Sequence, residues 1–354
     1  MTRHCSVKTE LQMPADGREC VRGRDSKPVG EEEHVSGRKA EPADGRKSSG
    51  DKTGGAAGGR RAAAGAFLSL FGGICWGLSG SMGQYLFTEQ GMDARWLVPI
   101  RLGLAGVVLF VYCLIRYRER LFAPWKSGRD RRDLLIYGIA GISLCQFLYF
   151  STIQLSTAGV GTILQDLSPI FILLVTCRLE HRRPGAREVL SIALALVGVF
   201  LITTHGSLTQ MAVRPAALLT GVLCAVCVMI YNVEPKHLLS SYPVTILQAW
   251  AFLLGSGILM ALFRPWDWGY HPTAMGYFGI AFVVLVGNVL AFTSYMAGVG
   301  MIGPNKAILY GFSEPITAAV VGVLLFHSGF TVWDGVGFAL VFLMLFLISG
   351  RKSA

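Results

Sequence analysis

The stretch YFSTIQLSTAGVGTILQDLSP, residues 149–169, has a related copy in the second half of the chain. Residues 295–315, YMAGVGMIGPNKAILYGFSEP, align to it without a gap at a constant offset of 146, which pairs Tyr149 with Tyr295 and Pro169 with Pro315. Weak internal repeats in an apolar chain are typical of membrane proteins built from two structural halves. The repeat therefore predicts a fold of two related units.

The composition around this repeat is that of an integral membrane protein. Hydrophobic residues make up 52% of the 354 residues, charged residues make up 15%, and the mean hydropathy is +0.50. Soluble proteins of this length carry more charge. Apolar segments recur with about the 20 residues that a helix needs to cross the hydrocarbon core. We expect ten such segments: 65–87, 96–115, 133–154, 158–177, 187–204, 214–233, 244–263, 273–298, 304–326 and 331–349.

Basic residues predict how these segments are oriented. The loops after the second and fourth segments are rich in Arg and Lys, as cytoplasmic loops are, whereas the loops after the first, third and ninth hold none in their centres. An even number of helices then places both termini in the cytoplasm. Each half has five helices, so the second half enters the membrane in the opposite sense. We predict an all-α membrane protein of ten transmembrane helices arranged as two inverted five-helix repeats, residues 65–206 and 213–349.

Residues 1–64 differ from the rest of the chain. They hold 13 of the 32 Lys and Arg and 10 of the 22 Asp and Glu, are rich in Gly and Ser, and show no apolar periodicity. Such a segment buries too little surface to fold, so we predict a disordered cytoplasmic tail. The first apolar run starts late and is long enough to span, so a signal peptide is not expected.

Neither the net positive charge nor the cysteines indicate another function. The net charge is +10, but the basic residues stand in short clusters between apolar segments, which argues against nucleic-acid binding. Cys224 and Cys227 have CxxC spacing, yet within an apolar helix such a pair is typical of small packing residues. We expect no metal and no organic cofactor.

Two five-helix halves, short hairpins that end in SP or EP, and the run RLEHRRPGAREVLSIALALVGVFLI at 178–202 resemble the EamA-type branch of the drug/metabolite transporter superfamily. The resemblance covers about residues 65–349 and implies transport of small organic solutes through a cavity between the halves. Arg101 matches the family's arginine in helix two, and Glu180 matches its acidic residue after helix four, whereas the second half has His327 and Ser328 there. We interpret Arg101 as structural, either snorkelling outward or binding helix-end carbonyls.

Asp166 is the first candidate for a functional residue. A carboxylate near the bilayer centre costs about 2.5–3.5 kcal/mol on insertion scales, so it normally faces a polar cavity or a partner. Pro169, three residues later, frees a backbone carbonyl at a similar depth, and Thr162 lies one turn earlier on the same face. Asp166 is interpreted either as a cation-binding or proton-accepting group, or as a carboxylate held by a neighbouring helix.

The ninth segment carries a second set of polar residues, Lys306, Tyr310 and Glu314, at i, i+4 and i+8. On one continuous helix they form one stripe. Lys306 then either meets an anionic group or Asp166, or snorkels to the helix end, and Glu314 either lines the cavity or caps its neighbour.

Further polar or aromatic side chains lie at plausible depth on the helices expected around the cavity. Each one singly is typical of a helix–helix hydrogen bond, whereas together they suit a pocket that binds and releases a solute. These candidates are Trp76, Gln146, Tyr149, Asn232, Asn288 and Tyr295.

The main alternative is an enzyme. GLSG, residues 77–80, matches the GxSG around the serine of rhomboid proteases, but the histidines at 205, 237 and 327 fall at helix ends, out of reach of a serine at membrane depth. We favour a non-enzymatic secondary transporter in the plasma membrane that works by alternating access, with proton coupling, facilitated diffusion and export all open. A small-molecule substrate and membrane lipid are the expected partners, and a homodimer is left open.

Overall fold

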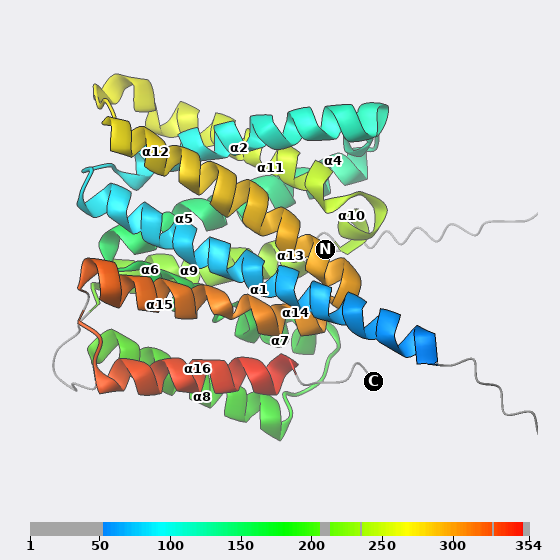
Figure 1. Ribbon diagram of the computed structural model, residues 1–354, viewed down its shortest axis with the longest axis vertical. Coiled ribbons are helices and arrows are strands. Elements are labelled where there is room, and N and C mark those ends of the chain that lie inside the picture. Colours follow the sequence, from blue (N-terminus) through cyan, green and yellow to red (C-terminus); the bar gives the residue numbers. More distant parts are fainter. Residues whose placement is uncertain (1–51, 206–212, 234–235, 328, 350–354) are drawn as a thin grey trace, which may run out of the picture. The chain divides into compact units, whose positions relative to one another are not determined.

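In the computed structural model the described residues are 52–205, 213–233, 236–327 and 329–349, and their regular structure is entirely helical (Figure 1). Within these ranges nine helical stretches have the length and composition to cross a membrane. They are Arg60–Thr88, Ala94–Lys126, Gly128–Leu155, Ala158–Leu179, Ala186–Thr204, Pro215–Val233, Val244–Phe263, Ala274–Ile302 and Leu309–Phe326. The tenth predicted segment is a helix whose apolar part, Val332–Leu347, is shorter. The chain is an all-helical, multi-pass membrane protein.

These stretches are built from helical elements that follow one another closely along the chain. The first half contains α1 (Lys52–Thr88), α2 (Ala94–Tyr117), η1 (Arg118–Phe122), α3 (Ala123–Lys126), α4 (Gly128–Leu135), η2 (Ile136–Ser143), α5 (Leu144–Leu155), α6 (Ala158–Gln165), α7 (Ser168–Leu179) and α8 (Ala186–Thr204). The second half contains α9 (Pro215–Val233), α10 (Lys236–Ser241), α11 (Val244–Phe263), η3 (Pro265–Trp268), α12 (Ala274–Phe282), η4 (Val283–Leu290), α13 (Ala291–Ile302), α14 (Pro304–Gly311), α15 (Ser313–Phe326) and α16 (Val332–Ser349).

The first helix is longer than the sequence suggests. Helix α1 begins at Lys52, so the prediction of a disordered segment is wrong for residues 52–64. Alanine and arginine, which are frequent just before the apolar run, are good helix formers, and extension of an existing helix avoids the cost of nucleation. The predicted tail from 1 to 51 lies outside the described residues.

The third and eighth spans share an unusual local feature. Each contains a π-helical stretch, η2 or η4, and each stretch is followed by a helix of 12 residues, α5 or α13. A π-helical turn widens the helix and shifts the faces of the residues around it. The polar side chains of these two spans are therefore positioned by the wide turns.

The fourth and ninth spans are each interrupted near the middle. Helix α6 ends at Gln165 and α7 begins at Ser168, while α14 ends at Gly311 and α15 begins at Ser313. Pro169 and Pro315 explain both breaks, because proline has no N–H to bond the carbonyl four residues earlier. Those carbonyls belong to Gln165 and Gly311, which end the two preceding helices.

Helices from the two halves pack against each other in pairs. Helix α1 packs on α13 and α15, α2 on α11, α5 on α9, and α8 on α16 (Figure 1). The α8–α16 contact brings backbones together, because a Cβ on Gly198 would lie 2.9 Å from the Gly337 carbonyl oxygen and one on Gly337 would lie 2.7 Å from that of Gly198. Small residues at such crossings permit close van der Waals packing between membrane helices.

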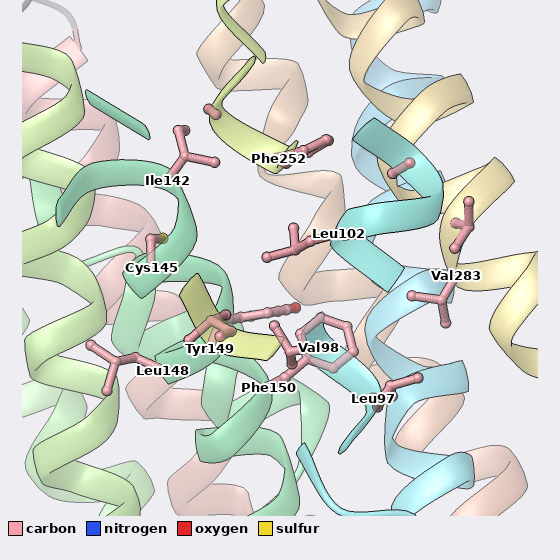
Figure 2. Packing of buried hydrophobic residues seen from close by; sticks show 14 of the residues in the cluster. Leu97, Val98, Leu102, Ile142, Cys145, Leu148, Tyr149, Phe150, Phe252 and Val283 are labelled. Atoms are coloured by element: carbon pink, nitrogen blue, oxygen red, sulfur yellow. The ribbon is translucent and has the colours of Figure 1, made fainter. Parts of the chain in front are cut away.

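The main core lies between α2, α5 and α11. Figure 2 shows Val98 of α2 beside Phe150 of α5, with Leu97, Leu102 and Tyr149 in the same cluster. The Tyr149 and Phe150 rings meet edge to face at 5.4 Å. This apolar packing fixes α5, which carries several of the polar side chains described next.

Candidate functional site

The two candidate carboxylates lie at the two helix breaks. Asp166 caps the end of α6, and Glu314 stands in the first turn of α15. Their charges are close enough to interact, and both act on Tyr295. Both side chains are partly exposed rather than fully buried. The structure thus brings Asp166, Glu314 and Tyr295 into one polar region.

A hydrogen bond joins the halves at this region. The Tyr149 hydroxyl of α5 donates to the Glu314 carboxylate of α15 at 3.3 Å. The α1 residue next to this hydroxyl must lack a side chain, because a Cβ on Gly80 would lie 2.8 Å from the hydroxyl oxygen. The tyrosine is therefore held between α1 and Glu314, in a position that sequence spacing does not reveal.

Two polar atoms of these helices have no hydrogen-bond partner among the residues that the structure describes. They are Oδ2 of Asp166 and Nδ2 of Asn288, and both are buried. Leaving a buried polar group unsatisfied costs about 1–3 kcal/mol, and more for a charged group. A carboxylate oxygen and an amide N–H left in this way are suited to accept from, and donate to, a bound solute.

An aromatic pair lies next to the carboxylates. The Trp76 ring of α1 and the Tyr295 ring of α13 have centroids 5.0 Å apart at an interplanar angle of 50°. Both side chains are partly exposed. Aromatic faces attract organic cations and also stack on planar solutes, so the pair offers an apolar surface beside the charged groups.

Arg101 is buried, contrary to the snorkelling role expected from the sequence. Its side chain is 2% exposed, donates to Gln146 Oε1, and places its guanidinium carbon 3.8 Å from the Phe150 ring centroid. Because α2 begins at Ala94, Arg101 lies about 10 Å of helical rise from the end of its helix. Its Nε–H has no hydrogen-bond partner in the described part of the chain. The sequence analysis placed the start of this span at residue 96, so it put Arg101 closer to the helix end than the start at Ala94 does. Gln146, one of the predicted site residues, accepts the hydrogen bond from this guanidinium.

Several other predicted residues do not join the polar region. Thr162 is buried, and its hydroxyl donates to the carbonyls of Ala158 and Gly159 in its own helix. Asn232 is exposed, and its amide donates to the Val228 carbonyl. The Thr162 hydroxyl and the Asn232 amide therefore bond within their own helices and do not contribute to the polar region in this conformation.

The expected stripe of Lys306, Tyr310 and Glu314 is also not formed. The break at Phe312 separates Glu314 from the two earlier residues. Lys306 and Tyr310 are exposed and line a groove on the surface of α14, α15 and α16. Residues four apart share one face only along an uninterrupted helix, and Pro315 interrupts this one.

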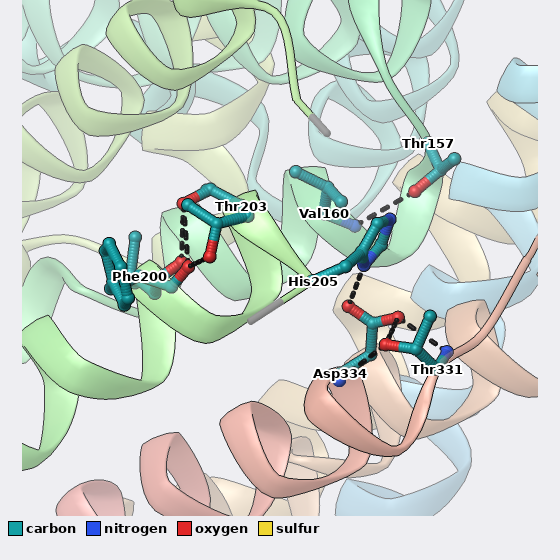
Figure 3. A network of polar contacts seen from close by, with 9 residues as sticks. Thr157, Val160, Phe200, Thr203, His205, Thr331 and Asp334 are labelled. Atoms are coloured by element: carbon teal, nitrogen blue, oxygen red, sulfur yellow. Dashed lines mark hydrogen bonds and ion pairs between the residues drawn. The ribbon is translucent and has the colours of Figure 1, made fainter. Parts of the chain in front are cut away.

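A further polar network lies where α8 ends and α16 begins, and sequence analysis missed it (Figure 3). His205 Nδ1 lies 2.7 Å from an oxygen of Asp334, and the other oxygen of Asp334 accepts from the N–H and hydroxyl of Thr331 at 2.7 and 2.8 Å. Asp334 is 4% exposed. The pattern TVWD at 331–334, in which a threonine and an aspartate three residues later cap a helix, was the available signal.

The protease arrangement is not present among the described residues. Ser79 is 4% exposed within α1 and packs against Gly287, and no hydrogen bond links it to a described histidine. In the same part of the chain no group of three or more His, Cys, Asp or Glu side chains could hold a metal ion. Cys224 lies buried at the α5–α9 contact, with its sulfur 3.6 Å from that of Cys145.

Comparison with known proteins places the chain in a family. The model of the EamA-like transporter family matches residues 63–204 and again residues 215–350. The chain belongs to the EamA-like transporter family. It is 31% identical over 282 residues to YicL, an uncharacterized inner membrane transporter of Salmonella typhimurium, covering 79% of this chain and 93% of that protein. It is also 23% identical over 274 residues to YyaM, an uncharacterized transporter of Bacillus subtilis, covering 75% and 86%.

The fold is shared with a protein of known crystal structure. The two superimpose with a TM-score of 0.56 at 16% sequence identity, covering 80% of this chain and 96% of the other. The family match and the relatives named above, together with the apolar helices, identify the chain as a membrane transporter, whereas this crystal structure shows only the shared fold.

Proposed function

We propose that this EamA-like transporter moves a small organic solute by alternating access of two inverted five-helix halves, 65–206 and 213–349, around Asp166 and Glu314. It acts in the plasma membrane with both termini in the cytoplasm and catalyses no covalent chemistry. The observation that carries the proposal is the Tyr149–Glu314 hydrogen bond, which links the two halves beside a second carboxylate.

The recurrence of local structure supports the inverted repeat. The π-helical stretch, the following 12-residue helix and the proline-linked break occur once in each half and in the same order. Helices α8 and α16 begin at Ala186 and Val332, which differ by 146, the offset of the repeated sequence. Such a recurrence is expected when both halves derive from one structural unit.

The packing of the helices agrees with a two-fold relation. Helix α2 packs on its counterpart α11, and α8 packs on its counterpart α16. The contact of α1 with α13 corresponds to that of α9 with α5. A two-fold axis in the membrane plane explains both kinds of contact: a helix beside the axis packs on its own counterpart, and every other contact between the halves occurs twice. Rocking of one half against the other then opens the region around the axis to each side of the membrane in turn.

The chemistry of the site favours coupling of transport to protonation. A carboxylate at membrane depth is far more stable when it binds a proton or a cation than when it stays charged and alone. The charges of Asp166 and Glu314 repel each other, so the two acids compete for such a proton or cation. Binding of solute and release of protons then become linked.

Reconstitution into proteoliposomes tests this proposal. Uptake of a panel of amino acids, nucleosides and organic cations is measured with and without a pH gradient for the native protein, Asp166→Asn and Glu314→Gln. We expect both variants to lose uptake and pH dependence. Tyr149→Phe, which removes the hydrogen bond but no charge, should retain pH dependence at a lower rate.

A matched control separates the site from general charge effects. Asp267 is an exposed loop acid paired with Arg264 at 3.0 Å, and Asp267→Asn should transport as the native protein does. Native rates and native pH dependence in both site variants would show that the carboxylates are only structural. Cleavage of a membrane peptide, lost in Ser79→Ala, would instead favour the protease.

A further inference from the structure

A surface groove lies between α14, α15 and α16, and neither Asp166 nor Glu314 is among the residues that line it. Its volume is about 510 Å³. Phe312 of the α14–α15 break and Phe342 of α16 form its aromatic wall, with ring centroids 6.2 Å apart. Ile316 and Phe346 line it as well and are 50% and 62% exposed. Most of the side chains that line this groove are therefore apolar.

The groove has one polar end. Lys306 stands in the first turn of α14, and Tyr310 follows one turn later, and both line the groove. Lys306 stands at the start of α14, and in the sequence Phe346 comes shortly before Arg351 and Lys352, so we place this end of the groove at the membrane surface, while Ile316 lies deeper along α15. The polarity runs from charged at the surface to apolar within, as it does in a phospholipid.

No described residue forms an ion pair with the charge at this end of the groove. Lys306 is exposed and takes part in no ion pair among the residues that the structure describes. The first turn of α14 holds no acidic residue. A cation near a helix N-terminus is opposed by the helix dipole, so an anion there is favoured. The groove therefore presents a cation and a phenolic donor above an apolar wall.

We propose that this groove binds an anionic glycerophospholipid, with its phosphate on Lys306 and Tyr310 and one acyl chain along the aromatic wall. Lysine acts as a point charge for phosphate, and basic pockets between membrane helices suit anionic headgroups. Burial of each methylene of the acyl chain adds apolar stabilisation. Neither Asp166 nor Glu314 lines the groove, so this lipid site does not depend on the proposed transport.

Native mass spectrometry of the purified full-length protein tests the proposal. The protein is equilibrated with equal amounts of palmitoyl-oleoyl phosphatidylglycerol and phosphatidylcholine, and the retained lipids are counted. We expect preferential retention of the anionic lipid. In Lys306→Ala that preference should fall about five-fold, the effect of one basic residue at an anionic surface. Lys306→Arg should keep it.

Two further variants make the result decisive. Arg214→Ala removes another exposed cation at a helix end, outside the groove and without an ion pair among the described residues, and should keep the preference. Leu309→Trp fills the groove with its charge intact and should lower retention of both lipids. An unchanged preference in Lys306→Ala, an equal loss in Arg214→Ala, or full retention in Leu309→Trp would each overturn the proposal. Should Lys306→Ala aggregate, the arginine and tryptophan variants decide alone.

Discussion

The α8–α16 crossing makes the sharpest prediction about stability. A Cβ at position 198 would lie 2.9 Å from the backbone oxygen of Gly337, and backbone cannot move aside as a flexible side chain does. Overpacking of this kind costs about 1–3 kcal/mol. Replacing a helical glycine by alanine regains about 0.5–1 kcal/mol of conformational entropy. We therefore expect Gly198→Ala to lower the free energy of unfolding by about 1–2 kcal/mol.

Gly257 is the matched control for this substitution. It is exposed on α11, and a Cβ there would meet nothing within 4 Å, so Gly257→Ala should raise the free energy of unfolding by about 0.5–1 kcal/mol. Equilibrium unfolding in mixed micelles, followed by circular dichroism, measures both. The two glycines of the crossing share one contact, so Gly198→Ala and Gly337→Ala should be less than additive in the double variant. Stabilisation by Gly198→Ala, or full additivity, would refute the close approach of these backbones.

Two further predictions concern the ends of helices. Although burial raises the pKa of Asp93, hydrogen bonds from Arg95 hold it below the usual 3.8, so its contribution to stability is present above that pH and is lost as the pH falls through the folded pKa. The free energies of unfolding of the native protein and Asp93→Ala should therefore differ at pH 6 and converge at acid pH, and an equal difference at both pH values would contradict this. Asp334→Ala removes the acceptor of Thr331 and should lower the free energy of unfolding by about 1–3 kcal/mol, measured in the same way. An unchanged midpoint would show that the network at the start of α16 is not needed for folding.

The ten predicted segments all contain helices, because hydropathy along the chain is enough to locate a span. The candidate site was predicted only in part. Asp166, Glu314 and Tyr295 stay candidates for one polar region, whereas Lys306 and Tyr310 line the outer groove, because the proline-linked break interrupts the ninth span.

The sequence alone determined the membrane class, the positions of the spans and the repeat at residues 149–169 and 295–315, since each of these depends on composition or order along the chain. Only the tertiary structure decided which face of each helix is internal. Lipid and protein interior are both apolar, so a membrane helix that is hydrophobic on all sides carries no periodic signal for its buried face. The bond of Tyr149 to Glu314 and the burial of Arg101 against Phe150 follow from that choice of faces.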